Sequence, residues 1–149
     1  MKFNTIFRFV LLLVVVAITF VSCSSDDSKN TVDETTKSVK DGTWKIGYFY
    51  DSGKDETADY AGYNFAFGDN SVLIASKETS PYTGQWFVFK SKSDDDLFST
   101  IFKISIGPEE IFQDLNRDWK LIENTGTSLK LKDDSQGELQ IEYLTFEKN

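Results

Sequence analysis

The sequence predicts an all-β fold: a small antiparallel up-and-down β-barrel of about eight strands with one short helix, over residues 42–149. Two observations carry this prediction. Segments in which apolar and polar residues alternate with a period of two recur along this region, and short turn-type connections separate them. Aromatic residues make up 15% of the chain, and they favour strands. Because closure removes exposed sheet edges, we expect a barrel rather than an open sandwich of the same strands.

Eight segments are expected to form the strands, and Gly, Asp, Asn and Ser are common in the links between them. The period of two predicts that the first strand carries four side chains on one face: Trp44, Ile46, Tyr48 and Tyr50. It places three on one face of the last strand: Leu139, Ile141 and Tyr143. A hairpin is expected over residues 61–77, ending before Pro81. The expected strands are residues 43–50, 63–67, 72–76, 84–89, 97–105, 118–123, 128–132 and 138–146.

The one helical signal lies between the fifth and sixth of these strands, over residues 107–115. Pro108 suits the first position of a helix, and the two Glu residues after it suit the positive end of the helix dipole. Three apolar side chains would share a face of this short helix: Ile111, Phe112 and Leu115.

The N-terminal segment has the organisation of a secretory signal. Lys2 and Arg8 make its start basic, and residues 9–21 form an apolar run that ends just before Cys23. This run is about 13 residues, roughly 20 Å as a helix, which is too short to span about 30 Å of bilayer hydrocarbon comfortably. We therefore predict a signal peptide over residues 1–22.

The stretch Phe20-Val-Ser-Cys23 resembles the lipobox of bacterial lipoproteins. The resemblance implies cleavage before Cys23, a diacylglyceryl group on its sulfur and an acyl group such as palmitate on its new amino group. Two lipid signals are what stable anchoring requires. Because Ser24 follows rather than Asp, the resemblance implies the outer membrane of the cell envelope, and Ser24-Ser-Asp-Asp27 is similar to the export signal of surface-exposed lipoproteins. The alternative is an ordinary signal peptide with an incidental cysteine.

Residues 23–41 are expected to form the lipidated cysteine and a disordered tether. Only Val32 and Val39 are apolar in the stretch that follows Cys23, so little surface could be buried to offset the entropy lost on ordering. The remaining residues, 42–149, are enough for one domain.

Charge and composition exclude several classes of function. Cleavage before Cys23 would remove two basic residues and no acid, which leaves 14 basic and 24 acidic residues and a formal charge of −10. This charge disfavours a nucleic-acid partner and electrostatic docking to anionic lipid. The chain has no His, so a Ser-His-Asp triad cannot form. We predict no catalytic residue, no enzymatic activity and no cofactor.

Two acidic sets offer clustered oxygen atoms of the kind that calcium prefers as ligands. They are Asp94–Asp96 and the set of Asp51, Asp55, Glu56 and Asp59. Neither has the spacing of a calcium-binding loop, so we expect solvated turns and no metal site.

Four short motifs occur in order along the predicted barrel: Gly42-Thr-Trp44, Gly84-Gln-Trp86, Asp118-Trp119 and Leu129-Lys-Leu131. Together they resemble the lipocalin-like domain of short lipoproteins of the Bacteroidetes type, and the first matches the Gly-x-Trp start of lipocalins. The resemblance implies a barrel that carries a small apolar ligand. The residues that would line its cavity are Trp44, Tyr48, Phe65, Trp86, Phe102 and Trp119. The alternative is that the tryptophans plug the barrel and pack in its core.

The sequence is therefore consistent with two alternative functions. One is a lipid-anchored carrier of a small apolar ligand, which requires an internal cavity of roughly 300 Å³ or more. The other is a structural or protein-interaction module with a filled core and an unidentified protein partner. This second function predicts an exposed apolar patch on one sheet face, and residues 84–89 are the place to look, because they are apolar on both faces.

Overall fold

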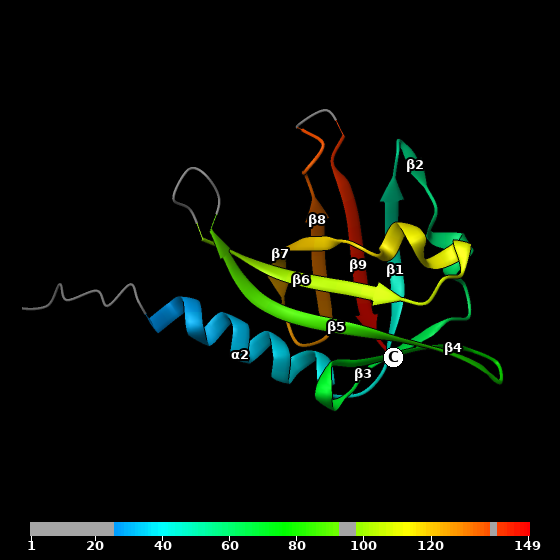
Figure 1. Ribbon diagram of the computed structural model, residues 1–149, viewed down its shortest axis with the longest axis horizontal. Helices are drawn as coiled ribbons and strands as arrows, with labels where there is room; N and C mark the ends of the chain where they lie inside the picture. Colours follow the sequence, from blue (N-terminus) through cyan, green and yellow to red (C-terminus); the bar gives the residue numbers. More distant parts are fainter. Residues whose placement is uncertain (1–25, 93–97, 138–139) are drawn as a thin grey trace, which may run out of the picture.

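The computed structural model describes residues 26–92, 98–137 and 140–149, with side chains described from residue 31 onward. The predicted signal peptide and Cys23 lie outside these ranges. The described elements are an α-helix, three 3-10 helices labelled η and nine strands (Figure 1). Their bounds are α2 Asp26–Lys40, β1 Trp44–Asp51, β2 Lys54–Asp55, η1 Thr57–Tyr60, β3 Asn64–Phe67, η2 Asp69–Ser71, β4 Val72–Lys77, β5 Ser80–Lys92, β6 Phe98–Ile106, η3 Glu110–Leu115, β7 Asp118–Asn124, β8 Ser128–Asp133 and β9 Glu142–Lys148.

Eight of the strands close into an antiparallel barrel, which confirms the predicted fold class. From β3 to β9 each strand pairs with the next one along the chain, and β9 pairs with β1 over Trp44–Tyr50. A single pairing of Trp44 with Phe65 joins β1 to β3 and completes the circle. The two-residue β2 pairs only with the end of β1 and stands outside the barrel as an extra strand.

A β-bulge in β1 overturns the expected face of that strand. The register against β9 shifts between Ile46 and Tyr48, so the alternation changes phase at Gly47. Ile46 and Phe49 therefore face the interior, whereas Tyr48 faces outward and is 40% exposed. The prediction that Tyr48 and Tyr50 share the inner face with Trp44 and Ile46 is wrong, because it assumed an unbroken period of two.

The last strand also has the opposite phase to the predicted one. Strand β9 begins at Glu142, and its inward residues are Glu142, Leu144 and Phe146. Tyr143 lies on the outer face at 37% exposure, and Leu139 is outside the described residues. The sequence pattern was misleading because an ionisable residue, Glu142, occupies an inward position.

The expected disordered tether is also wrong for residues 26–40, which form α2. Val32, Thr35 and Val39 are spaced three and four residues apart, so they lie on one face of a helix. Thr35 and Val39 are fully buried against the barrel. Two apolar residues are too few to predict a helix from the sequence. Packing against the barrel supplies the stabilisation that the isolated segment lacks.

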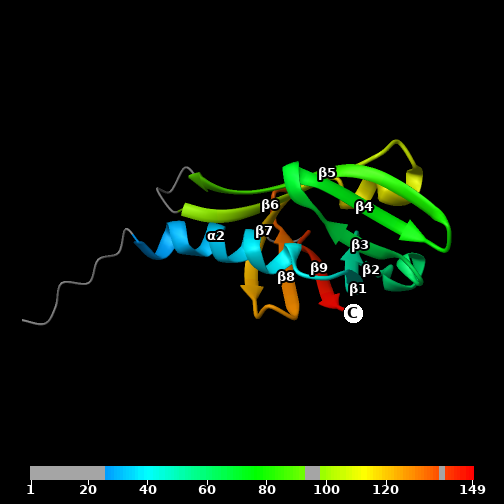
Figure 2. The same cartoon turned by 90° about the horizontal axis from the view of Figure 1, so that it is seen from below.

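Polar contacts attach the C-terminal half of α2 to the end of the barrel. The Ser38 hydroxyl donates to Oδ1 of Asn124, 3.0 Å away at the end of β7, and Lys40 pairs with Asp69. Seen from below, α2 runs across the ends of β7 and β8 (Figure 2). The helix therefore covers one end of the barrel.

Two smaller departures concern prolines. Strand β5 begins at Ser80 and includes Pro81, which pairs with Ser76 of β4. Strand β6 pairs with β5 only from Gly84 onward, so Pro81 sits where one side of the strand has no partner, as proline requires. The predicted helix at 107–115 is a 3-10 helix that starts at Glu110, beyond Pro108.

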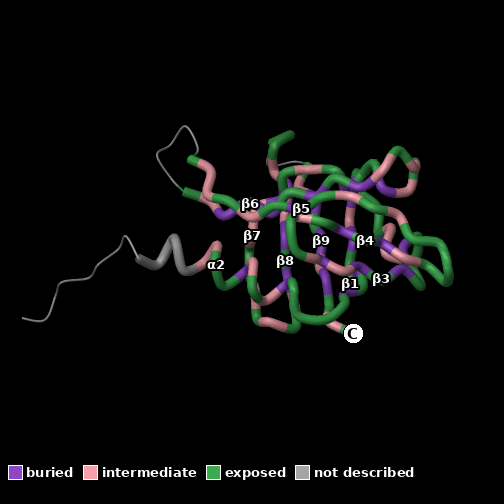
Figure 3. Tube along the Cα trace, turned by 60° about the horizontal axis from the view of Figure 1, so that its bottom comes forward, coloured by how far each residue is buried: buried purple, intermediate pink, exposed green. Residues whose placement is uncertain are grey.

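Aromatic side chains fill the barrel interior. Phe67 lies at the centre, with its ring centroid 5.3 Å from that of Phe102 and 5.5 Å from that of Phe146, in nearly perpendicular orientations. Such edge-to-face pairs are favourable beyond the area that they bury. Buried and exposed positions alternate along the strands (Figure 3). The largest fully buried aromatic side chains are Trp44, Phe49, Phe65, Phe67, Phe102, Phe112, Trp119 and Phe146.

Candidate functional site

Five of the six residues predicted to line a ligand cavity lie in this packed core. Phe65 and Phe102 are fully buried, and each is in ring contact with a further core phenylalanine. Trp86 stacks on Phe102 with 5.9 Å between ring centroids and also meets Phe67 at 5.6 Å. Side chains thus occupy the space around these residues that a cargo would need.

The three tryptophans attach connecting segments to the barrel through their indole N–H groups. Trp44 donates to the carbonyl oxygen of Val39 in α2 at 2.8 Å. Trp86 donates to the carbonyl of Gly68 at 3.1 Å, and Trp119 to that of Leu115 in η3 at 3.0 Å. Each buried donor is therefore satisfied by backbone. This arrangement favours the structural alternative, in which the tryptophans plug and pack.

The sixth residue, Tyr48, lies on the outer surface. Its ring stacks on that of Tyr50, 6.4 Å away and inclined by 12°. Tyr143 is opposite Tyr50 in the β1–β9 pairing. The structure therefore does not bring Tyr48 together with the other five.

Tyrosines and η3 close the barrel end opposite α2. Tyr60 is buried and donates its hydroxyl to the carbonyl of Ile111 at 2.8 Å. Burial raises the pKa of Tyr60, and nearby carboxylates, first Asp114, add to the effect. Tyr63 and Tyr82 pack edge-on against Phe112, with centroid distances of 5.4 and 5.1 Å. These residues seal the end, so the interior is covered on both sides.

A charged cluster, which we call the Arg117 cluster, lies at the same end. Nη2 of Arg117 is 3.1 Å from Oδ2 of Asp51 and 3.6 Å from Oδ1 of Asp114. Nη1 is 3.7 Å from Oδ2 of Asp133 and contacts Oε2 of Glu142. The side chains of Asp51 and Glu142 are each 6% exposed, so these charges are desolvated. One guanidinium therefore holds carboxylates from β1, η3, β8 and β9 together.

The guanidinium of Arg117 also lies over the Trp119 ring, 5.6 Å from its centroid. A cation at this distance from an indole face is attracted by the ring quadrupole. This contact joins the charged cluster to the aromatic core beneath it.

The acidic set of Asp51, Asp55, Glu56 and Asp59 is only partly assembled in the fold. Carboxylate oxygens of Asp51 and Glu56 approach that of Asp114 to within 4.8 Å of one another. Asp55 instead accepts a hydrogen bond from the Thr57 N–H, and its hydrogen bonds with Thr57 lower its pKa. Arg117 already pairs with two of the three converging carboxylates. Asp94–Asp96 lies outside the described residues.

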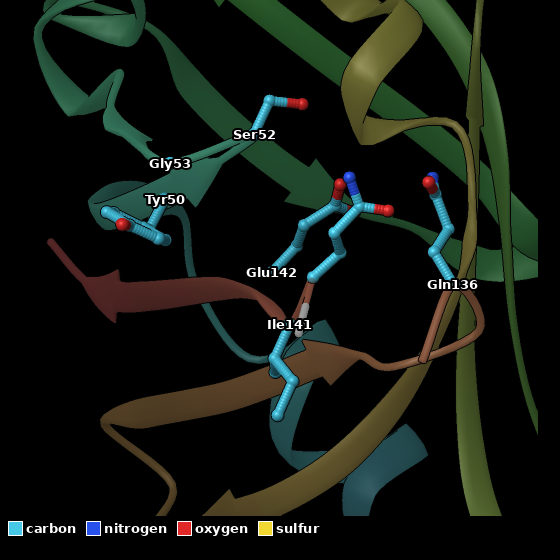
Figure 4. A pocket seen from close by; sticks show the side chains of 7 residues that line it. Tyr50, Ser52, Gly53, Gln136, Ile141 and Glu142 are labelled. Carbon is cyan, nitrogen blue, oxygen red and sulfur yellow. The ribbon is translucent and has the colours of Figure 1, made fainter. Parts of the chain in front are cut away.

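A pocket of about 280 Å³ opens beside the Arg117 cluster (Figure 4). We call it the polar pocket. The turn after β1 and the segment before and at the start of β9 supply its walls. Its lining residues are Tyr50, Ser52, Gly53, Gln136, Gln140, Ile141 and Glu142.

Four large apolar side chains form an exposed stripe on the outer face of β4 and β5. We call this set the outer apolar stripe: Val72, Ile74, Phe87 and Phe89, each between 36% and 41% exposed. Val72 and Ile74 pair with Gln85 and Thr83, whose side chains lie on the same side of β5 as the two phenylalanines. The prediction of an apolar patch at 84–89 is thus matched by exposed phenylalanines.

The Arg117 cluster was not predicted from the sequence. One signal could have indicated it: Arg117 is the only arginine after Arg8, and it lies two residues before a strand tryptophan. Asp114 lies three residues before Arg117, but the other acidic partners, Asp51, Asp133 and Glu142, come from distant strands, so no local spacing reveals them. The polar pocket depends on the same long-range assembly.

No protein-family model matches the chain, and no curated protein matches it. A crystal structure of a DUF4847 family protein from Bacteroides vulgatus ATCC 8482 is similar, with a TM-score of 0.49 and 16% sequence identity. The match covers 77% of this chain and 97% of that one.

Within the parts of the chain that the structure describes, no helix has the length and hydropathy needed to cross a bilayer.

Proposed function

We propose that this chain is a lipid-anchored, non-enzymatic protein-interaction module of the cell envelope. The observation that carries the proposal is the contrast between the two faces of β5. Its inner face packs into a closed aromatic core, whereas its outer face exposes Phe87 and Phe89 beside Val72 and Ile74.

The filled interior argues against the rival function, carriage of a small apolar ligand. A cargo would have to displace core rings such as Phe67 and Phe102, which are buried and in mutual contact. Moving one buried phenylalanine side chain into water costs about 1.5–3 kcal/mol, a substantial share of the stability of a small domain. Small barrels are commonly filled by their own side chains, and this one fits that class.

The outer apolar stripe has the composition of an interface centre. Aromatic side chains are enriched at the centres of protein interfaces, and a few of them supply most of the binding energy. An ion pair between Lys103 and Asp118, 2.6 Å apart, lies beside Phe87 and gives the stripe a polar border. An apolar centre with a charged rim suits a protein partner.

The anchor is the part of the proposal that rests on sequence. Only Ser24 and Ser25 separate Cys23 from the first residue of α2. Because α2 packs on the barrel, a lipid at Cys23 would hold the domain near the membrane surface. Outer-membrane attachment, with the domain exposed at the surface, follows from the resemblance of residues 20–27 to lipoprotein signals.

Site-specific photo-crosslinking in living cells tests the interaction. A photoreactive amino acid at position 87 should give a discrete adduct with a protein, since Phe87 lies in the proposed interface. The matched control is position 130, an exposed outward residue on β8, which should give no such adduct. Identical adducts from both positions, or none from position 87, would overturn the proposal.

A second variant tests whether the outer apolar stripe itself makes the crosslinked contact. Phe89→Ser should reduce the adduct from position 87 at least several-fold while leaving expression unchanged, because Phe89 is partly exposed and outward-facing. An undiminished adduct would show that the stripe does not make the contact.

A further inference from the structure

We propose that the polar pocket binds a small primary amine in its protonated form. The polar pocket and the outer apolar stripe share no residue, so this inference does not depend on the proposed protein partner. The pocket is about 280 Å³, near the lower end of the size range of ligand sites, so the ligand is a small molecule.

The chemistry of the walls selects against anions. A carboxylate, two amides and a hydroxyl supply the polar surface, from Glu142, Gln136, Gln140 and Ser52. No lining residue in the described part of the chain is basic. The Ser52 hydroxyl is itself hydrogen-bonded to Oδ1 of Asp51, 3.1 Å away.

Charge behind the wall favours a cation. Among the described residues, Arg117 is the one cation that pairs with the four carboxylates of the Arg117 cluster, and Glu56 brings a fifth carboxylate beside Asp51 and Asp114. Because the side chains of Asp51, Asp133 and Glu142 are largely buried, salt screens their charges weakly and their negative potential extends into the pocket. A positively charged ligand would relieve this excess.

Hydrogen-bond geometry favours a primary ammonium over other cations. An ammonium group has three N–H donors, and Glu142, Gln136 and Gln140 each carry a side-chain oxygen that can accept one. All three residues line the same pocket, and Figure 4 shows Gln136 and Glu142 among its lining side chains. A quaternary ammonium has no N–H to offer these oxygens and is usually held by several aromatic rings, of which the described lining has one.

The remaining wall suits the carbon skeleton of such a ligand. Tyr50 and Ile141 are the apolar lining residues, and the Tyr50 ring can also attract the cation through its face. Gly53 leaves backbone accessible at the rim. An amine with a short aliphatic or ring skeleton therefore fits both halves of the pocket.

Calorimetric titration of the purified full-length chain tests the proposal with matched probes. The pairs are 1,4-diaminobutane with 1,4-butanediol, and glucosamine with glucose, which differ mainly in the ammonium group. We expect saturable one-to-one binding of at least one amine, and at least tenfold weaker binding of its neutral counterpart. Equal binding within both pairs, or no binding of either amine, would overturn the proposal.

Variants locate the binding. The double variant Gln136→Ala with Gln140→Ala should weaken amine binding at least tenfold, and the control Gln85→Ala, on the distant outer face of β5, should leave it unchanged. Glu142→Gln should also weaken binding, but Glu142 supports the barrel through Arg117. The glutamine variants therefore carry the test. Amine binding that they leave unchanged, or that is multisite, would indicate general attraction to an acidic surface and would contradict the pocket.

Discussion

Arg117 joins four segments of the chain through charges that are mostly out of water. Its partners Asp51 and Glu142 are each almost fully covered, and Arg117 itself is 18% exposed. Such a cluster need not exceed a well-packed apolar alternative in stability. Its members nevertheless depend on one another, because removing one partner leaves the rest buried without compensation.

Arg117→Met should therefore destabilise the fold strongly. The variant keeps a long side chain over Trp119 but leaves Asp51 and Glu142 unpaired, which costs about 3–5 kcal/mol in the free energy of unfolding. Urea denaturation followed by tryptophan fluorescence measures this. The control is Lys103→Met, which removes an ion pair with Asp118 that is about half exposed and should cost no more than about 1 kcal/mol. Equal losses from both variants would mean that the Arg117 cluster is not a structural centre.

Tyr60 makes stability depend on alkaline pH. Its pKa in the folded state is raised, mainly by burial, above the ordinary value of 10.0. Above about pH 10 the unfolded chain releases this proton while the folded chain retains it, so this contribution to stability is complete below pH 10 and declines as pH rises. The phenol thus favours folding at neutral pH and opposes it in base.

Tyr60→Phe should show both effects. It loses the hydrogen bond to Ile111, which costs about 1 kcal/mol at pH 8. Between pH 10 and 11.5 its stability should fall less steeply than that of the unmodified chain. Parallel pH profiles for the Tyr60 variant and the unmodified chain would contradict the assignment.

At the scale of elements, local alternation was sufficient to predict most strands. The hairpin of β3 and β4, the long β6, and β7 and β8 all lie within a few residues of their expected ranges, because one wet and one dry face leave a readable period. The bulge at Gly47 and the phase of β9 were not predictable in this way. The bulge depends on pairing with a strand about 100 residues away, and Glu142 faces inward only because Arg117 receives it.

Helix α2 was likewise not predictable from local sequence, because its stability depends on contacts with the barrel. Its narrow face of Val32, Thr35 and Val39 carries too little apolar surface to order an isolated segment. The end of the barrel provides the complementary surface. The indole N–H of Trp44 donates a hydrogen bond to the Val39 carbonyl and so attaches the helix to the barrel. Hence a segment with the composition of a linker forms a helix that covers a core.

Val39→Ala tests this role of α2. Val39 is fully buried in the core, so truncation should lower the free energy of unfolding by about 1–3 kcal/mol. Val32→Ala, at a half-buried position on the same helix, should cost distinctly less. The comparison uses chemical denaturation at neutral pH. No loss from Val39→Ala would mean that the segment behaves as the disordered tether that its composition suggests.

At the scale of the whole molecule, the barrel is closed around and filled by its own aromatic side chains. The predicted ligand-lining residues could be located from motifs, but the sequence could not show whether they surround a cavity or one another. Ring packing decides that, and it depends on the simultaneous placement of side chains from most of the strands. Five of the six predicted residues contribute to the core, and Tyr48 is separated from them by the bulge.

Cys23 should determine where the whole molecule resides. If the residue is lipidated, Cys23→Ala should move the protein from the membrane pellet to the soluble fraction after cell disruption, because the covalent anchor supplies the attachment. Ser22→Ala is a suitable control, since it retains a small residue before the cysteine. Unchanged fractionation of the Cys23 variant would contradict the proposed anchor.

The most direct test of the filled barrel is native mass spectrometry of the full-length protein, extracted from cell envelopes without denaturation, with parallel lipid extraction. We expect a mass equal to that of residues 23–149 and their covalent lipid, with no additional apolar species bound. A discrete apolar molecule that copurifies at about one per chain would contradict the filled core and would support the rival function, carriage of a small apolar ligand.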